Sequence, residues 1–204
     1  MKKLLATVAM LFACAMATGA STPAPLSTLH AVAALTNAQA SGHPRVAFEA
    51  TVIYFFGPGR ILDVQDNDVG IFVRPPKDAK LVSGDRVLVR GTLEPSFLPY
   101  ILSSSITVVG HDPLPKPVDA TFDDLVSTRV NCRLVRIRGI VRTADIVKSQ
   151  DAPRGRIHLL MEGGYADLVL QTTDAAALKD LLDAEVEVTG ASGRELDSKI
   201  QQTG

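Results

Sequence analysis

Four histidines are the side chains of this chain best suited to bind a transition metal. They lie in unlike surroundings: His30 in an Ala-rich run, His43 before a proline, His111 in a proline-rich stretch and His158 in an expected strand. None has a second histidine or cysteine at the short spacing that zinc and copper sites use. The sequence therefore predicts no metal site, and nothing in it indicates a cofactor.

Two other groups of residues could carry chemistry. Asp63, Asp66 and Asp68 suggest a calcium loop, but the glycine and the closing glutamate of such a loop are missing, and Asn67-Asp68 fits a tight turn. The serines at 103–105 have no Gly-x-Ser-x-Gly elbow around them. We therefore expect this chain to have no catalytic residue and not to be an enzyme.

Aromatic side chains, which can stack on a ligand, are concentrated in the first half of the chain. They occur in two clusters, at 54–56 and 97–100. Phe72 lies between the clusters, with Arg74 two residues after it. The alternative reading is that about half of these rings plug the ends of a barrel. The candidate ligand-binding residues are Tyr54, Phe55, Phe56, Phe72, Arg74, Phe97 and Tyr100.

The elements that position these residues are short strands. Val46, Phe48, Ala50 and Val52 alternate with more polar residues, which indicates a strand with one buried face. Turn signals then separate four further apolar segments, at 60–66, 69–74, 82–91 and 100–109. Five short strands with a crossing segment between the third and fourth predict a small Greek-key barrel of the OB type.

The same pattern returns in the second half. Val135, Ile137, Gly139 and Val141 alternate as in the first copy, and a fourth strand follows at 184–190. Between them Asp174 begins a helix, with Ala177, Leu178, Leu181 and Leu182 on one side. A fifth strand is missing unless residues 199–204 begin it. Because this would leave an unpaired edge, we infer that the chain is the N-terminal part of a longer protein.

The expected fold is therefore mainly β, with two tandem five-stranded OB-like barrels, short connecting helices and a second barrel that is incomplete at its C-terminal end. Thr28 (or Ser27), Thr36 and Thr121 are expected to begin short helices, the last in a capping box with Asp124. The expected divisions are a signal peptide at 1–20, a helical adaptor at 21–44, the first barrel at 45–110, a proline-rich linker with a short helix at 111–130 and the second barrel at 131–204.

The N-terminus has the layout of an export signal. Lys2 and Lys3 precede an apolar run, and small residues at Ala17 and Ala20 fit a cleavage site. The run around Cys14 also resembles a lipobox, so a lipid at Cys14 is an alternative. Either reading predicts an exported, periplasmic protein in which Cys132 is left without a cysteine partner.

Charge argues against nucleic acid as the partner. Without the two leader lysines, 19 Lys and Arg residues remain against 22 Asp and Glu residues, a net charge near −3. Arg136, Arg138 and Arg142 form one basic stripe that could bind phosphate. We instead expect them to pair across strands with Glu185 and Glu187.

The strands resemble a known region: the tandem OB-like N-terminus of exported, membrane-bound bacterial sensor histidine kinases and diguanylate cyclases of acidobacterial type. The resemblance runs from about residue 27 to the end, and its motifs are largely the strand pattern of an OB barrel. They are VAFEATVIY (46–54), LDVQD (62–66), GIFV (70–73), GDRVLVRG (84–91), PLP (113–115), VRIRGIV (135–141) and SKIQQTG (198–204).

The resemblance implies a region outside the inner membrane, followed by a membrane helix and a cytoplasmic output domain. This sequence contains neither, so no catalytic residue is carried over. We expect a non-catalytic extracytoplasmic sensory or interaction module of a two-component or cyclase signalling protein, with an unknown small ligand or protein partner. The alternatives are a stand-alone periplasmic OB-fold binding protein and an adaptor region of an exported hydrolase or nuclease.

Overall fold

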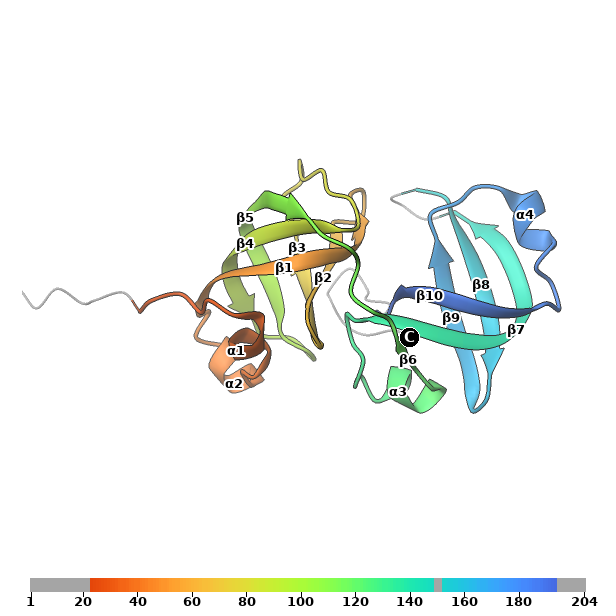
Figure 1. Ribbon diagram of the computed structural model, residues 1–204, viewed down its shortest axis with the longest axis horizontal. Coiled ribbons are helices and arrows are strands. Elements are labelled where there is room, and N and C mark those ends of the chain that lie inside the picture. The colour runs from red at the N-terminus through yellow and green to blue at the C-terminus, as the bar shows by residue number, and fades with distance from the viewer. Residues whose placement is uncertain (1–22, 149–151, 194–204) are drawn as a thin grey trace, which may run out of the picture.

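The computed structural model describes residues 23–148 and 152–193. The expected leader, Cys14 and the possible start of a fifth strand at 199–204 lie outside these residues. Two β-rich units sit side by side, and they are joined by an extended linker and by direct contacts (Figure 1). The protein is mainly β, as the sequence predicts.

The first unit is a closed barrel of five strands in the order β1-β2-β3-β5-β4, which we call the first barrel. The strand β5 closes it by pairing antiparallel with β4 and parallel with β3. This is the connectivity of an OB fold. The strands are β1 (Arg45–Phe56), β2 (Ile61–Asp66), β3 (Val69–Arg74), β4 (Asp85–Glu94) and β5 (Tyr100–His111).

Two short helices, α1 (Leu29–Ala33) and α2 (Asn37–Ala40), close one end of the first barrel (Figure 1). Thr28 and Thr36 cap them through their side-chain oxygens, as expected. Leu29 and Val32 are buried in the barrel core because the helix presents both to the strands. The adaptor is thus part of the barrel's core.

The strand β4 begins three residues later than the sequence suggests. Gly84 has a φ of 96°, and the carboxylate of Asp85 accepts a hydrogen bond from the Val82 N–H at 2.9 Å. This turn holds Val82 outside the strand, where it is exposed. Ladder pairing therefore starts at Asp85.

The second unit, which we call the second sheet, has the strand order β10-β7-β8-β9, with β6 (Val118–Asp119) paired parallel to β7. Its strands are β7 (Leu134–Val147), β8 (Arg154–Met161), β9 (Gly164–Leu170) and β10 (Glu185–Ala191). Within the described residues β9 and β10 are not joined. Leu168 and Val188 are accordingly half-buried, whereas Val73 and Val89 in the first barrel are fully buried.

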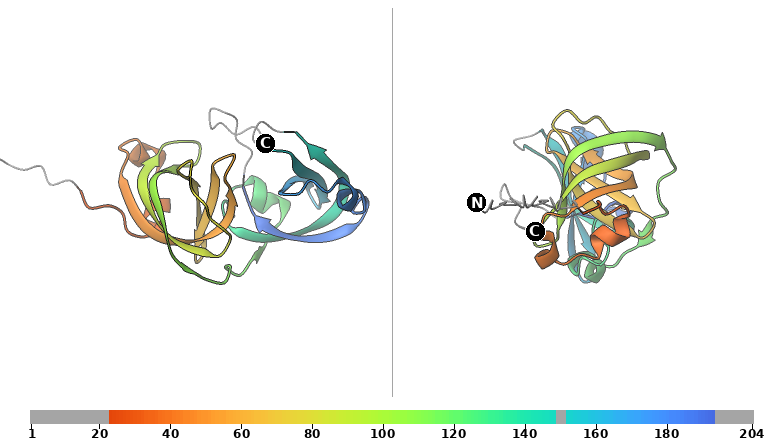
Figure 2. Two further views of the ribbon diagram at one scale, coloured as in Figure 1. Left: turned by 90° about the horizontal axis from the view of Figure 1, so that it is seen from above. Right: turned by 90° about the vertical axis from the view of Figure 1, so that its left-hand side faces the viewer.

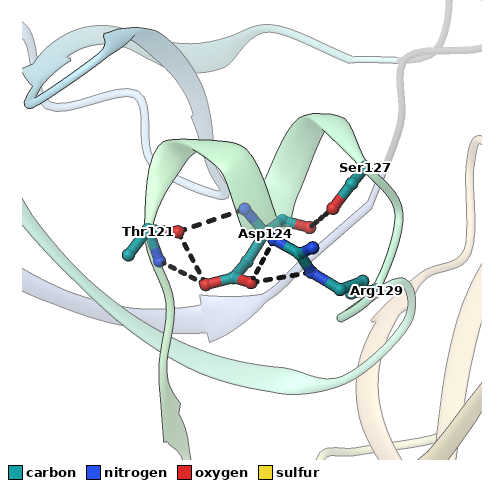
Figure 3. Close-up of polar contacts among 4 residues, drawn as sticks. All are labelled: Thr121, Asp124, Ser127 and Arg129. Atoms are coloured by element: carbon teal, nitrogen blue, oxygen red, sulfur yellow. Dashed lines mark hydrogen bonds and ion pairs between the residues drawn. The ribbon is translucent and has the colours of Figure 1, made fainter.

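Two helices flank the second sheet (Figures 1 and 2). The helix α3 (Phe122–Val126) begins with the expected capping box, in which Thr121 and Asp124 bond each other's backbone N–H, and Arg129 holds the Asp124 carboxylate (Figure 3). The helix α4 (Ala175–Lys179) is shorter than expected. Ala177 is exposed, and Leu182 lies beyond the helix and is exposed too, so the expected four-residue apolar face is wrong at these two positions.

No helix within residues 23–148 and 152–193 has the length and apolar character that a bilayer crossing requires.

Candidate binding face on the first barrel

Strand pairing lines up four side chains across the outer surface of the first barrel. Tyr54 pairs with Asp63, and Asp63 pairs with Phe72, so the three side chains share one side of the sheet. The Phe72 and Tyr100 rings are 5.9 Å apart between centroids and tilted by 43°. The row Tyr54, Asp63, Phe72 and Tyr100, together with Arg74, is the candidate face.

A β-bulge sends Tyr54 outward. Val52 pairs with Val64 and Tyr54 with Asp63, so the register shifts at the residue between them. Strict alternation would have placed Tyr54 inside with Val52. The bulge turns Phe55 inward instead, where it packs against the core opposite Leu62. Phe55 therefore packs half-buried against the barrel core and does not belong to the outward row.

The second sheet covers one end of this surface. Phe56 is buried, with the guanidinium carbon of Arg154 4.9 Å from its ring centre. The side-chain amide of Gln171 donates to the Phe55 carbonyl at 2.9 Å. Phe56 is thus part of the contact between the two units.

Residues 130–134, which we call the junction segment, cover the other end. The side-chain oxygen of Gln65 accepts a hydrogen bond from the Leu134 N–H at 2.8 Å, and its amide donates to the Asn67 carbonyl at 2.6 Å. Gln65 pairs with Thr51 and Gly70, so this row adjoins the aromatic one. Gln65 points outward yet is buried, because the junction segment lies on it, and Thr51 beside it on β1 is buried as well.

Asp63 is the one carboxyl of the candidate face. It is 6% exposed, and this burial raises the pKa of its carboxyl to about 7. The hydrogen bond with the Cys132 thiol opposes that shift because it favours the carboxylate. Cys132 in turn accepts a hydrogen bond from the Asn131 amide at 3.2 Å. The junction segment therefore reaches into the candidate face.

The remaining candidate residues lie at the edges of the face. Arg74 ends β3, two residues after Phe72, and its Nε is buried with no hydrogen-bond partner among the described residues. Phe97 is 67% exposed in the connection between β4 and β5, just before Tyr100. The structure thus brings Tyr54, Phe72 and Tyr100 into one row, packs half-buried Phe55 against the barrel core and buries Phe56 between the two units.

Sequence reasoning missed Asp63, Gln65 and the junction segment as parts of this surface. In the sequence, Asp63 suggests only a calcium loop that lacks its glycine and its closing glutamate. The structure places it beside a thiol and between two aromatic rings, and no group of three metal-ligating side chains occurs within the described parts of the chain. The sequence does contain one signal, because the polar residues Asp63 and Gln65 alternate with apolar residues in this strand. This alternation predicts that both side chains point outward, but it does not predict which part of the chain covers them.

Each of the four histidines contacts a carboxylate. The distances are 3.0 Å for His30 to Asp68, 2.8 Å for His43 to Glu94, 3.2 Å for His111 to Asp85 and 3.0 Å for His158 to Asp167. The last pair stands on β8 and β9 at the positions that Asp63 and Phe72 hold on β2 and β3. The two units thus share a framework but differ in the chemistry of this row.

The basic stripe on β7 is paired, though with partners that differ in part from those expected. Arg138 binds Glu187 at 2.7 Å, as predicted. Arg136 also pairs with Glu187, at 4.0 Å, as predicted, and has a closer partner in Asp119 at 2.7 Å, while Arg142 binds Asp183 at 2.8 Å. Glu185 stands opposite Ile140 in the register and so does not face an arginine directly.

The second sheet also has a hollow of ≈ 730 Å³, between the start of α3, β7 and the β8–β9 turn. Arg136 and Arg138 line it, and their charges are already matched by Asp119 and Glu187. The candidate face on the first barrel instead offers outward aromatic rings and the Nε donor of Arg74, which has no partner among the described residues. These groups suit ligand binding better than the charge-matched arginines of the hollow do, so we favour the candidate face as the binding site.

Comparisons with known proteins add little. No family model matches the sequence, and no curated protein matches it. Among solved structures, a chain of the S. pombe Stn1–Ten1 complex is similar at 14% identity, over 44% of this chain and 79% of that chain, with a TM-score of 0.34. At that similarity, the OB-like assignment rests on the strand order and pairing of this chain itself.

Proposed function

We propose that this chain is a non-catalytic, extracytoplasmic sensory or interaction module that binds its ligand on the candidate face of the first barrel. The observation that carries the proposal is the outward row of Tyr54, Phe72 and Tyr100 on β1, β3 and β5. OB barrels bind ligands on the face of their second and third strands and with the adjoining loops.

The contacts of the second sheet support a sensory role. Gln65 and Phe56 lie at the two ends of the candidate face, and each is in contact with the second unit, through Leu134 and Arg154. A ligand that displaces either contact changes how the two units are joined. A binding event on the first barrel can therefore be passed toward β7 and β8.

A ligand screen by thermal shift tests the binding site. We would use neutral and acidic oligosaccharides, amino acids and short peptides, which are ligands that an exported binding domain can meet. A true ligand should raise the melting temperature of the wild type, and Phe72→Ala or Tyr100→Ala should abolish the rise. Tyr165→Ala is the matched control, because Tyr165 is an exposed tyrosine on β9 of the second sheet. A shift that persists in both face variants would place the ligand elsewhere.

Sequencing the gene beyond the Gly204 codon tests the signalling role. We expect an open frame that encodes a membrane helix and a histidine kinase or diguanylate cyclase domain. A stop codon would favour a stand-alone periplasmic binding protein, and nuclease or hydrolase motifs would favour an adaptor. Cell fractionation and the mass of the mature N-terminus test export. We expect cleavage after Ala17 or Ala20, and a lipid on Cys14 would be the contrary result.

A further inference from the structure

The junction segment occupies part of the surface on which OB barrels bind ligands. Its residues Cys132 and Leu134 lie on β2 and β3, where Gly70 leaves room for the Cys132 carbonyl and Gln65 holds the Leu134 N–H. Cys132 takes a left-handed backbone conformation, with φ 53°, to make this approach. The segment is therefore fitted to the barrel surface and is more than a passive linker.

The surface beneath the segment contains an ionisable group. Asp63 is buried by the segment and by its neighbours in the sheet, and its side chain bonds the Cys132 thiol. A carboxylate in such a place loses its hydration, whereas a neutral carboxylic acid costs much less to bury. Docking of the segment and ionisation of Asp63 therefore oppose each other.

The titratable groups around Asp63 do not offset this cost. Tyr54 faces it from β1, Arg74 lies further along the same side of β3, and Cys132 and Arg133 belong to the junction segment. Arg86, further along the barrel surface, is paired with Asp66 at 3.0 Å and Glu49 at 3.5 Å. The causes that set the Asp63 pKa are burial first and the thiol hydrogen bond second, and neither is a pairing with a cation.

We propose that the junction segment is a latch on the ligand face of the first barrel, and that its hold weakens as the pH rises toward neutrality. The docked segment favours protonated Asp63, so the docked state binds one proton that the released state gives up. Docking is then strongest near pH 4 and weakest at about pH 7 and above. Release exposes Gln65 and Gly70 beside the aromatic row. The latch does not depend on the proposed ligand binding.

Hydrogen exchange of the full chain, without ligand, tests the latch. Protection is measured at pH 4.5, 6.0 and 7.5, after correction for the intrinsic rate, at the Leu134 amide, which the barrel holds through Gln65, and in peptides covering β2. The Cys132 amide, which donates to the Ser192 carbonyl of the second unit, is the internal control. We expect protection of the Leu134 amide to fall with pH, by at most about tenfold per unit for a single proton, while protection of β2 is kept. Loss of protection in both regions at once would mean global unfolding and would overturn the proposal.

Two variants complete the test. Asp63→Asn keeps the shape and removes the charge, so its junction segment should stay protected at every pH. Asp112→Asn, at an exposed aspartate of the linker, should behave like the wild type. Protection that is independent of pH in the wild type, or a fall with pH that survives in Asp63→Asn, would overturn the proposal.

If Asp63→Asn does not fold, the carboxyl carbon of Asp63 can be titrated by NMR in the wild type. A midpoint near 7 is expected for the docked segment, and a midpoint near 4 would overturn the proposal.

Discussion

Gly70 on β3 lies directly against the backbone carbonyl of Cys132, so closely that a Cβ at residue 70 would overlap that carbonyl. The two residues belong to different units, and glycine is the residue type that lets both backbones come this close. The contact between the units thus depends on a missing side chain as well as on the hydrogen bond from Leu134 to Gln65.

Gly70→Ala should therefore loosen the junction segment. We expect a loss of about 1–3 kcal/mol in the free energy of unfolding, or release of the segment from the barrel, because the methyl group has no space. Urea denaturation and hydrogen exchange of residues 130–136 measure the two effects. Gly110→Ala is the control, since a Cβ there meets its nearest neighbour at an ordinary 3.8 Å. Equal behaviour of the two variants would contradict the tight contact.

Asp63→Asn should stabilise the protein at neutral pH. The folded pKa of Asp63 is about 7 and the ordinary value 3.8, so the folded state holds a proton that the unfolded state releases between these values. The wild type therefore loses stability from this group as pH rises from about 4 to about 7, by at most about 4 kcal/mol. Unfolding of both proteins across this range should give curves that agree near pH 4 and separate above it. Parallel curves would show that Asp63 does not titrate on folding.

Phe55→Ala and Tyr54→Ala should differ although the residues are adjacent. Phe55 is half-buried and packs against the core opposite Leu62, so its truncation should cost about 2–3 kcal/mol. Tyr54 is half-buried on the outer surface, and we expect about 1 kcal/mol from its loss. Urea denaturation of both variants measures this difference. A larger loss for Tyr54→Ala would contradict the bulge that turns it outward.

Thr121→Ala should destabilise the second sheet by about 1 kcal/mol, because it removes the cap of α3 (Figure 3). The hydrogen bonds from Thr121 lower the pKa of Asp124, with Arg129 adding to the effect. This contribution is present above the ordinary carboxyl pKa and is lost as the pH falls through the lowered one. The difference between wild type and Thr121→Ala should therefore shrink in acid, and a difference that grows there would contradict the capping box.

The repeat, the strands and the helix caps could be predicted from sequence because they depend on local patterns. Alternating apolar residues mark β1 and β7, and Thr36 and Thr121 mark the first turns of helices wherever the chain goes next. The OB-type order of the first barrel followed from the number and spacing of these strands, whereas the parallel pairing of β6 with β7 was not predicted.

The composition of the candidate face could be predicted only in part, since it depends on two non-local events. The bulge before Tyr54 reverses the sides taken by Tyr54 and Phe55, and the period of two gives no sign of it. Asp63 is buried by a segment about 70 residues away in the chain, so its raised pKa has no local cause. Tyr54, Phe72 and Tyr100 stay candidates, whereas Phe55 belongs to the core.

The strand β7 begins at Leu134, the residue whose N–H is held by Gln65, so no slack separates the junction from the strand. Its 14 residues are about 45 Å of extended chain, and they pair with β10 on one side and β8 on the other. The strand bends at the register shift between Val141 and Thr143, so its first half follows β10 and its second half follows β8. A displacement of Leu134 on the first barrel is therefore a displacement of the strand that both neighbours share.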